Sequence, residues 1–233
     1  REAKGSASCA LRSAAARLRA SGADGHTARG AAALRGATQA KTEEKDGCVN
    51  IIDQVKDTIT QRGLATPETP VLLMVSGGSD STVLAYIAYE LRKQQAIGPL
   101  AMLHVNHMLR GENSDADAEF VAHLAQLLEI PLFAAQVDVA RLVQEESGNT
   151  EAIARRERYA LAADALQSLC AHAGVPLSQG RVFTAHTQDD RVETFYMRSI
   201  VGTGPGGFRS MTYRNGCICR PLLDESRQNL RDY

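Results

Sequence analysis

The stretch V71-L-L-M-V-S-G-G-S-D-S-T-V-L-A-Y-I-A88 joins a fully apolar segment to a second apolar-rich one through a turn of small polar residues. The apolar run at 71–75 has the length of a buried strand, and residues 81–95 have helical spacing. The glycines at 77 and 78 let the backbone approach a ligand closely and adopt a positive φ. The stretch therefore predicts a βα unit whose turn lies at the ligand edge of a parallel sheet.

Strand-like and helix-like segments alternate along the rest of the chain. Helices are predicted over 49–60, 81–95, 115–129, 151–173 and from 189, and strands over 71–75, 100–107, 131–139, 182–185 and 217–223. This alternation predicts an α/β fold: a doubly wound, mainly parallel five-stranded, Rossmann-like sheet with helices on both faces. If the first and fourth strands flank the point where strand order reverses, residues 76–81 and 186–193 face each other across one crevice.

The first 46 residues differ in composition from the rest. They are rich in Ala, Arg, Gly and Ser, which predicts a weakly ordered tail before a domain at 47–233. Residues 1–41 hold eight Lys and Arg and two acids, so this segment carries +6 and the remainder −7. The tail is either an unstructured extension or an organelle transit peptide. Because the domain is net acidic, any RNA contact must use local arginine clusters rather than a broadly basic surface.

The lengths of the apolar runs bear on membrane association, and the number and spacing of the cysteines bear on the cellular compartment. No apolar run approaches the roughly 20 residues that span a bilayer, so no membrane partner is expected. The five cysteines are odd in number and irregularly spaced, which favours a reducing compartment. We expect a cytoplasmic protein, or a plastid or mitochondrial one if the tail is a transit peptide.

The turn after the first strand is the first candidate site. Successive N–H groups at a helix N-terminus form an anion nest, and serine hydroxyls add donors. Asp80 would either cap the helix or help to hold Mg²⁺. The alternative is a tight βα turn that merely requires glycine. The candidate phosphate-binding residues are Ser76, Gly77, Gly78, Ser79, Asp80 and Ser81.

Two further motifs carry histidine and arginine. The second strand ends in H104-V-N-H-M-L-R110, at the edge where ligands bind, so His107 is a candidate site residue. Asn149 or Thr150 is expected to cap the long helix at 151–173, and Arg155 and Arg158 share a face of its first turns. The helix dipole disfavours cations there, which suggests an anionic ligand, although a solvated charged face is the simpler alternative.

The fourth motif, T184-A-H-T-Q-D-D-R-V-E-T194, delivers His186 and several carboxylates to a helix N-terminus. Asp189 and Asp190 are good first-turn acids, so capping is one explanation. Carboxylates beside a phosphate loop also suit Mg²⁺, which takes one or two of them plus substrate phosphates. Glu193 lies three residues after Asp190 and can face the same site. The glycine-rich segment 202–207 is expected to form a flexible loop on the substrate side.

S-G-G-x-D-S after an apolar strand resembles the PP-loop of N-type ATP pyrophosphatases, which have an adenine nucleotide alpha hydrolase-like fold and cleave ATP between the α and β phosphates. That chemistry needs no Walker lysine. Across residues 70–233, the order H-V-N-H-x-L-R-G, E-A-x-A-R-x-x-R-Y, H-x-x-D-D-x-x-E-T, a glycine-rich loop and R-P-L-L resembles the tRNA(Ile)-lysidine synthetase family. Thr187 and Gln188 stand where that family often has a histidine and a small residue.

The resemblance implies a carbon–nitrogen ligase that uses ATP and Mg²⁺. Its partners would be free L-lysine and tRNA(Ile) with a CAU anticodon, whose wobble cytidine is adenylated before lysine displaces AMP. The family's C-terminal RNA-binding domains are not expected within these 233 residues. The implied roles are ATP binding by residues 76–81, His107 and His186, metal binding by Asp80, Asp189 and Asp190, and catalysis by Asp80, Asp189, Asp190, Glu193, Arg155 and Arg158.

Two other functions stay open. A PP-loop tRNA thiolase would typically need cysteine pairs near the site, and Cys217-x-Cys219 is not the C-x-x-C of such a pair. A catalytically inactive nucleotide- or RNA-binding module is the third hypothesis. ATP binding without turnover would favour it.

Overall fold

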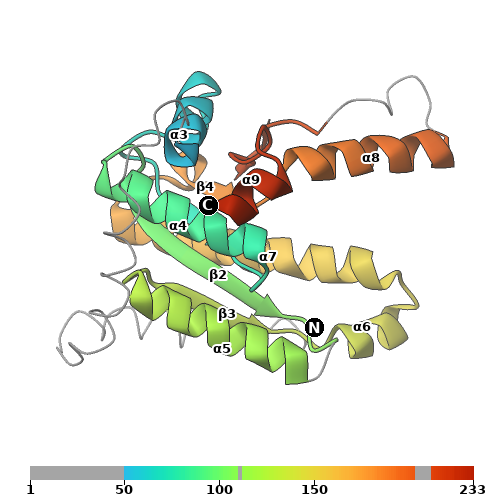
Figure 1. The fold of residues 1–233 in the computed structure, drawn as a ribbon. Coiled ribbons are helices and arrows are strands. Elements are labelled where there is room, and N and C mark those ends of the chain that lie inside the picture. Colours follow the sequence, from blue (N-terminus) through green and yellow to red (C-terminus); the bar gives the residue numbers. More distant parts are fainter. Residues whose placement is uncertain (1–49, 110–111, 203–210) are drawn as a thin grey trace.

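The computed structural model describes residues 50–109, 112–202 and 211–233. It contains the predicted strand–helix alternation (Figure 1). The strands are β1 (Val71–Met74), β2 (Leu100–Asn106), β3 (Leu132–Gln136), β4 (Arg181–Phe183), β5 (Arg214–Asn215) and β6 (Ile218–Cys219). The helices are α3 (Ile51–Gln61), α4 (Ser79–Lys93), α5 (Glu112–Leu127), α6 (Val139–Glu146), α7 (Thr150–Ala173), α8 (Gln188–Val201) and α9 (Arg227–Asp232), with a 3₁₀ turn, η1 (Leu177–Gln179).

The sheet has the order β3-β2-β1-β4-β6-β5. Its five predicted strands are parallel neighbours, and β5 adds a sixth, antiparallel strand through its pairing with β6. The prediction of five strands was therefore one short. The predicted strand at 217–223 is also shorter, because the chain leaves the sheet after Cys219 and Pro221 has no N–H to donate to a ladder.

Strand order reverses between β1 and β4, as predicted. Leu73 pairs with Met102 of β2 on one side and with Phe183 of β4 on the other. Both partners run parallel to β1, so the ends of β1, β2 and β4 meet at one edge of the sheet. This is the point at which doubly wound sheets bind ligands.

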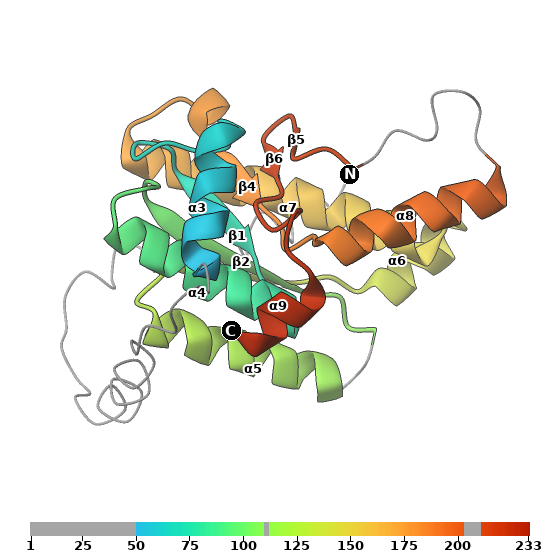
Figure 2. The same ribbon diagram turned by 45° about the horizontal axis from the view of Figure 1, so that its top comes forward.

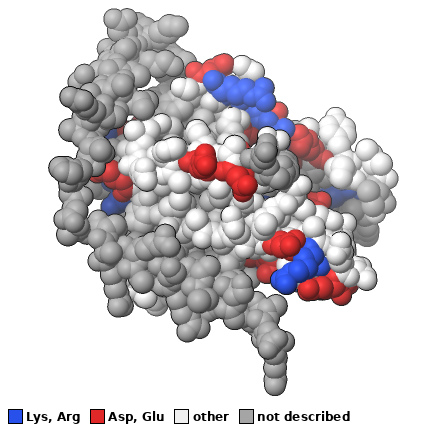
Figure 3. Space-filling view, turned by 90° about the horizontal axis from the view of Figure 1, so that it is seen from below, with Lys and Arg blue, Asp and Glu red and all other residues white. Residues whose placement is uncertain are grey.

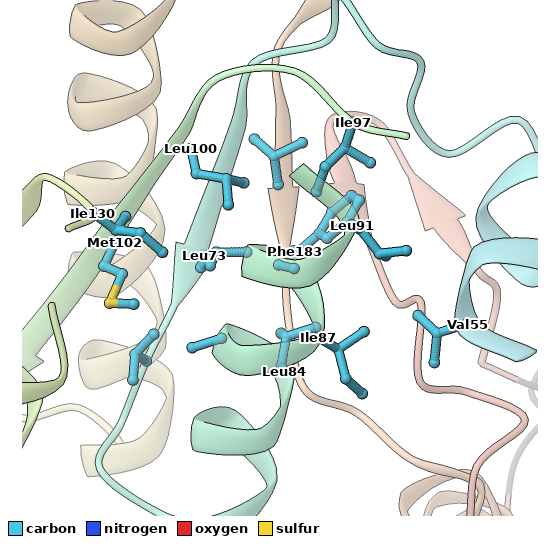
Figure 4. Packing of buried hydrophobic residues seen from close by; sticks show 14 of the residues in the cluster. Val55, Leu73, Leu84, Ile87, Leu91, Ile97, Leu100, Met102, Ile130 and Phe183 are labelled. Atoms are coloured by element: carbon cyan, nitrogen blue, oxygen red, sulfur yellow. The ribbon is translucent and has the colours of Figure 1, made fainter. Parts of the chain in front are cut away.

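The sheet buries apolar side chains on both faces, because side chains alternate along each strand. Leu73 of β1 and Met102 of β2 pack with α4 on one face, where Leu84, Ile87 and Leu91 are almost fully buried (Figure 4). Leu72 and Leu103 point to the other face and pack with α7 and α6. Figure 1 shows α4 and α7 on opposite sides of the sheet.

Two helices were missing from the sequence prediction. The segment 131–139 is a strand only to Gln136, and α6 begins at Val139 behind the N-cap Asp138, whose carboxylate accepts from the Arg141 N–H at 2.9 Å. The short α9 packs beside α4 and buries Leu230 in the same core (Figure 2). No helix in the described ranges is both long and apolar enough to cross a bilayer.

Charged side chains are interspersed on the face drawn in Figure 3, where Lys and Arg lie next to Asp and Glu. No broad basic area appears among the residues described on that face, in keeping with the net acidic domain.

Candidate active site

The turn after β1 is held by its own hydroxyls. The Ser81 hydroxyl donates to the Gly78 carbonyl at 2.9 Å and accepts from the Ser76 N–H at 3.1 Å. Gly77 adopts φ +94°, and a Cβ on it would lie 3.0 Å from Asp117. The buried Ser81, a predicted phosphate ligand, has its hydroxyl engaged inside the turn and also lines the cavity described below, so its role toward phosphate stays a prediction. The contacts of Ser81 therefore fix the shape of the loop.

A cavity of about 770 Å³ opens at the ends of β1, β2 and β4. The residues 76–81 loop lies on one side and residues 184–186 with Asp190 on another, so the predicted crevice is present. Among the sequence-predicted residues, its walls include Ser76, Gly78, Ser79, Asp80, Ser81, His107, Arg155, Arg158, His186 and Asp190. Asp189 and Glu193 are not part of the wall.

The end of β2 contributes a fixed turn and one histidine near the arginines. Asn106 donates to the Asp115 carboxylate at 2.9 Å and accepts from the Met108 N–H at 2.8 Å. His107 Nε2 lies 3.3 Å from Arg158 Nη2 and accepts from it. Burial, and then the charge of Arg158, lower the pKa of His107. His107 is therefore neutral near pH 7.

The start of α7 supplies two arginines to the cavity. Asn149 caps this helix by accepting from the Ala152 N–H at 3.0 Å. Arg155 and Arg158 line the cavity, and the contacts of the described residues include no carboxylate within ion-pair distance of either. Arg156, between them, instead pairs with Glu146 at 2.6 Å on the surface. Two cations on the wall of one cavity, with no carboxylate partner among the described residues, favour an anionic ligand.

The start of α8 is a capping box built on a position where the family pattern differs. The fully buried Thr187 accepts from the Asp190 N–H, and the Asp190 carboxylate accepts from the Thr187 N–H at 2.7 Å. The two residues thus satisfy two backbone donors of the helix N-terminus. His186 Nδ1 lies 2.9 Å from the Thr184 hydroxyl, and burial lowers the pKa of this imidazole.

Arg227 is one of two arginines at the site that sequence reasoning missed. Its guanidinium Nη2 lies 2.5 Å from Asp190, its Nη1 lies 2.7 Å from Glu193, and its Nε lies 3.6 Å from Asp80. Its backbone N–H donates to Asp189 at 2.8 Å. All four predicted carboxylates therefore contact this one residue. The only local signal was Ser226, a good N-cap before a short helix.

Arg220 was also missed. This arginine is 6% exposed, donates from Nη1 to the Thr212 carbonyl at 2.8 Å, and has a buried Nε without a partner among the described residues. Burial lowers its pKa, and its charge is the second cause that lowers the pKa of His186. It therefore adds positive charge behind the arginine side of the site.

The predicted metal residues separate into two roles. Asp80 and Asp190 line the cavity, whereas Asp189 holds the start of α9 through the Arg227 N–H. The described residues contain no group of three or more His, Cys, Asp or Glu placed to hold a metal ion together. Asp80 and Asp190 nevertheless fit Mg²⁺, because this ion commonly uses only one or two carboxylates and takes its other oxygens from phosphates and water.

The predicted glycine-rich loop falls largely outside the described residues, which resume at residue 211. Its role on the substrate side stays a prediction.

The chain is similar to known proteins over the described domain. Residues 49–233 match the family model of the PP-loop domain. A tRNA(Ile)-lysidine synthase of Thermus thermophilus is 38% identical over 168 residues, covering 72% of this chain and 30% of that protein. The protein of the same name from Symbiobacterium thermophilum is 36% identical over 187 residues, covering 78% and 37%. This chain thus spans about a third of the length of these relatives.

A solved structure, the U34-tRNA thiolase of Methanococcus maripaludis, superposes with a TM-score of 0.55 at 17% identity, covering 77% of this chain and 60% of that one. At this identity the similarity concerns the fold alone. It supports the doubly wound α/β architecture.

Proposed function

This chain belongs to the PP-loop domain family, and on that premise we propose that it carries out ATP-dependent lysine ligation to the wobble cytidine of tRNA(Ile). The observation that carries the proposal is the single cavity in which the residues 76–81 loop, Arg155 and Arg158, and the carboxylate Asp190 meet. The curated relatives named above supply the substrate class.

The first step is adenylation. The loop N–H groups and the Ser76 and Ser79 hydroxyls bind the β and γ phosphates at the N-terminus of α4. The C2 carbonyl oxygen of the cytidine attacks the α-phosphorus, the α–β bond breaks, and pyrophosphate leaves. Arg155 and Arg158 neutralise charge that develops on the α-phosphate or the RNA backbone. Asp80 and Asp190 would hold Mg²⁺, which neutralises phosphate charge when bound.

The second step is lysine transfer. The ε-ammonium group of free lysine loses a proton to solvent, and the amine formed attacks C2. AMP leaves with the cytidine O2 oxygen, a carbon–nitrogen bond forms, and the added nitrogen gives up a second proton to solvent. The carboxylates at the start of α8 attract the lysine ammonium group. The site must hold two nucleophiles in turn, each against its own electrophilic centre, so positioning contributes much of the rate.

The described cysteines do not favour the thiolase alternative. Cys170 and Cys219 are buried, and burial raises the pKa of Cys219 to about 11. A thiol with so high a pKa carries little of the reactive thiolate at neutral pH. Cys217, two residues before Cys219 in the chain, is exposed.

The test is AMP release from ATP, Mg²⁺, lysine and a tRNA(Ile) transcript with a CAU anticodon. We expect AMP to depend on both lysine and the wobble cytidine. R158Q should lower the rate at least about tenfold, because Arg158 faces the cavity. The matched variant R156Q removes the same charge from a surface ion pair and should keep wild-type activity. ATP binding without lysine-dependent AMP release would instead support the inactive module.

A further inference from the structure

Arg227 sits at a junction between the two halves of the site. It is the first residue of α9, whose N-cap Ser226 accepts from the Asn229 N–H at 3.1 Å. The preceding Glu225 carbonyl accepts from the Gln188 N–H at 2.9 Å, so the chain before α9 is tied to the start of α8. Leu230 anchors α9 in the core beside α4. The guanidinium is thereby directed at the carboxylates from a fixed backbone.

The guanidinium joins the phosphate-loop helix to the carboxylate helix. It contacts Asp80, from α4, and Asp190 and Glu193, from α8. The two helices stand more than 90 residues apart in the sequence. A planar guanidinium suits this task, because its several N–H donors reach different carboxylates at once.

The contacts of Arg227 include the two carboxylates that fit Mg²⁺, Asp80 and Asp190. A divalent cation that binds these oxygens meets the positive charge of the guanidinium within a few ångströms. Two cations in one place repel each other, so binding of one opposes binding of the other. The two Arg227 contacts differ in length, at 2.5 Å to Asp190 and 3.6 Å to Asp80. Asp80 is therefore the less firmly held of the pair.

We propose that Arg227 is a positioning residue that serves as the internal counter-ion of Asp80 and Asp190, and that a divalent cation must displace its guanidinium to bind them. Arg227 keeps the two helices in register before the cation arrives. The displaced guanidinium is then free for an anion beside Asp80 and Asp190, such as a phosphate of the nucleotide. This inference rests on the proposed function only in taking the cation to be one that accompanies ATP.

The direct test measures Mn²⁺ binding to the nucleotide-free chain. Binding is monitored through the electron paramagnetic resonance signal of the Mn²⁺ that stays free in solution. R227Q should bind Mn²⁺ about fivefold or more tightly than the wild type, because a competing cation has been removed. R227K keeps the charge and should stay closer to the wild type. The matched control is R231Q, which removes the same charge one turn along α9 from a side chain with no carboxylate contact among the described residues. R231Q should bind Mn²⁺ as the wild type does.

A second measurement needs no variant and so does not depend on the folding of R227Q. Hydrogen exchange of the wild-type segment 220–233 should speed up when Mn²⁺ is added, because displacement of Arg227 loosens the start of α9. The proposal would be overturned if R227Q bound Mn²⁺ more weakly than the wild type, or if R231Q gained as much Mn²⁺ affinity as R227Q. It would also be overturned if the hydrogen exchange of segment 220–233 did not change when Mn²⁺ was added. None of these outcomes depends on tRNA or lysine, so failure of the proposed ligase activity is detected separately.

Discussion

Replacing Gly77 with alanine tests whether the phosphate loop requires a residue without a Cβ at this position. Gly77 has φ +94°, outside the range that residues with a Cβ adopt freely, and its new Cβ would lie 3.0 Å from the Asp117 side chain. A non-glycine residue held in such a conformation costs about 1–3 kcal/mol. Removing glycine also stiffens the unfolded chain, but that gain is realised only where the native φ suits alanine. We therefore expect G77A to lower the free energy of unfolding by about 1–3 kcal/mol.

The neighbouring glycine provides the control. Gly78 is the N-cap of α4 at φ −75°, and its nearest neighbour for a Cβ is the Ser76 hydroxyl at 3.6 Å, an ordinary contact. Alanine there loses part of the N-cap preference, about 0.5–1 kcal/mol. It regains about 0.4–1 kcal/mol through the unfolded state. The two terms nearly cancel, so G78A should stay within about 0.5 kcal/mol of the wild type.

The assay is urea unfolding of the nucleotide-free protein, with the midpoint and slope fitted for the wild type, G77A and G78A. Without nucleotide, the comparison isolates backbone strain from lost phosphate contacts. If G77A and G78A agree within about 0.5 kcal/mol, the strain argument for this loop is refuted.

Two further predictions concern the start of α8. T187A removes the buried hydroxyl of the capping box and should lower the free energy of unfolding, measured in urea, by about 1 kcal/mol. T187S keeps a hydroxyl and should retain most of that free energy. Equal losses in the two variants would contradict the capping role. Burial holds the pKa of His186 below its ordinary 6.5, so the unfolded chain binds the extra proton first and stability falls as the pH drops through 6.5. The urea midpoint should therefore fall less between about pH 7.5 and pH 5.5 in H186Q than in the wild type. An identical fall would show that His186 does not contribute to the pH dependence of stability.

The layout of the fold followed from local signals. Apolar runs of strand length alternate with amphipathic segments, and parallel strands place their following loops at one edge, so the facing of residues 76–81 and 186–193 was predicted, and His186 and Asp190 do line the same cavity as the 76–81 loop. The signal for α6 was also present in the spacing of Val139, Leu142 and Val143 after the N-cap Asp138. It was overlooked because the strand before it has the same apolar character.

Arg227 illustrates what a single sequence cannot provide. Its partner Asp80 is 147 positions away, and nothing near either residue specifies their pairing. The contact exists because Leu230 docks α9 beside α4, which is a result of tertiary packing. For Asp189 and Ser81, residue type likewise indicated ligand chemistry but could not indicate the local hydrogen bonds that both make within the scaffold.

The pairing of β1 with β4 has a consequence for the growing chain. Leu73 and Phe183 lie side by side although 110 residues separate them, so the cavity lacks the part of its wall that Thr184, Ala185, His186 and Asp190 form until the ribosome has passed β4. Since domains fold largely as units during synthesis, the nascent N-terminal half must pass a long interval with the β4-facing edge of β1 unpaired. Nucleotide stabilises only a state that it can bind, and so cannot protect this intermediate. Chaperone binding to nascent chains that end before residue 181 should accordingly be insensitive to ATP analogues that stabilise the finished domain.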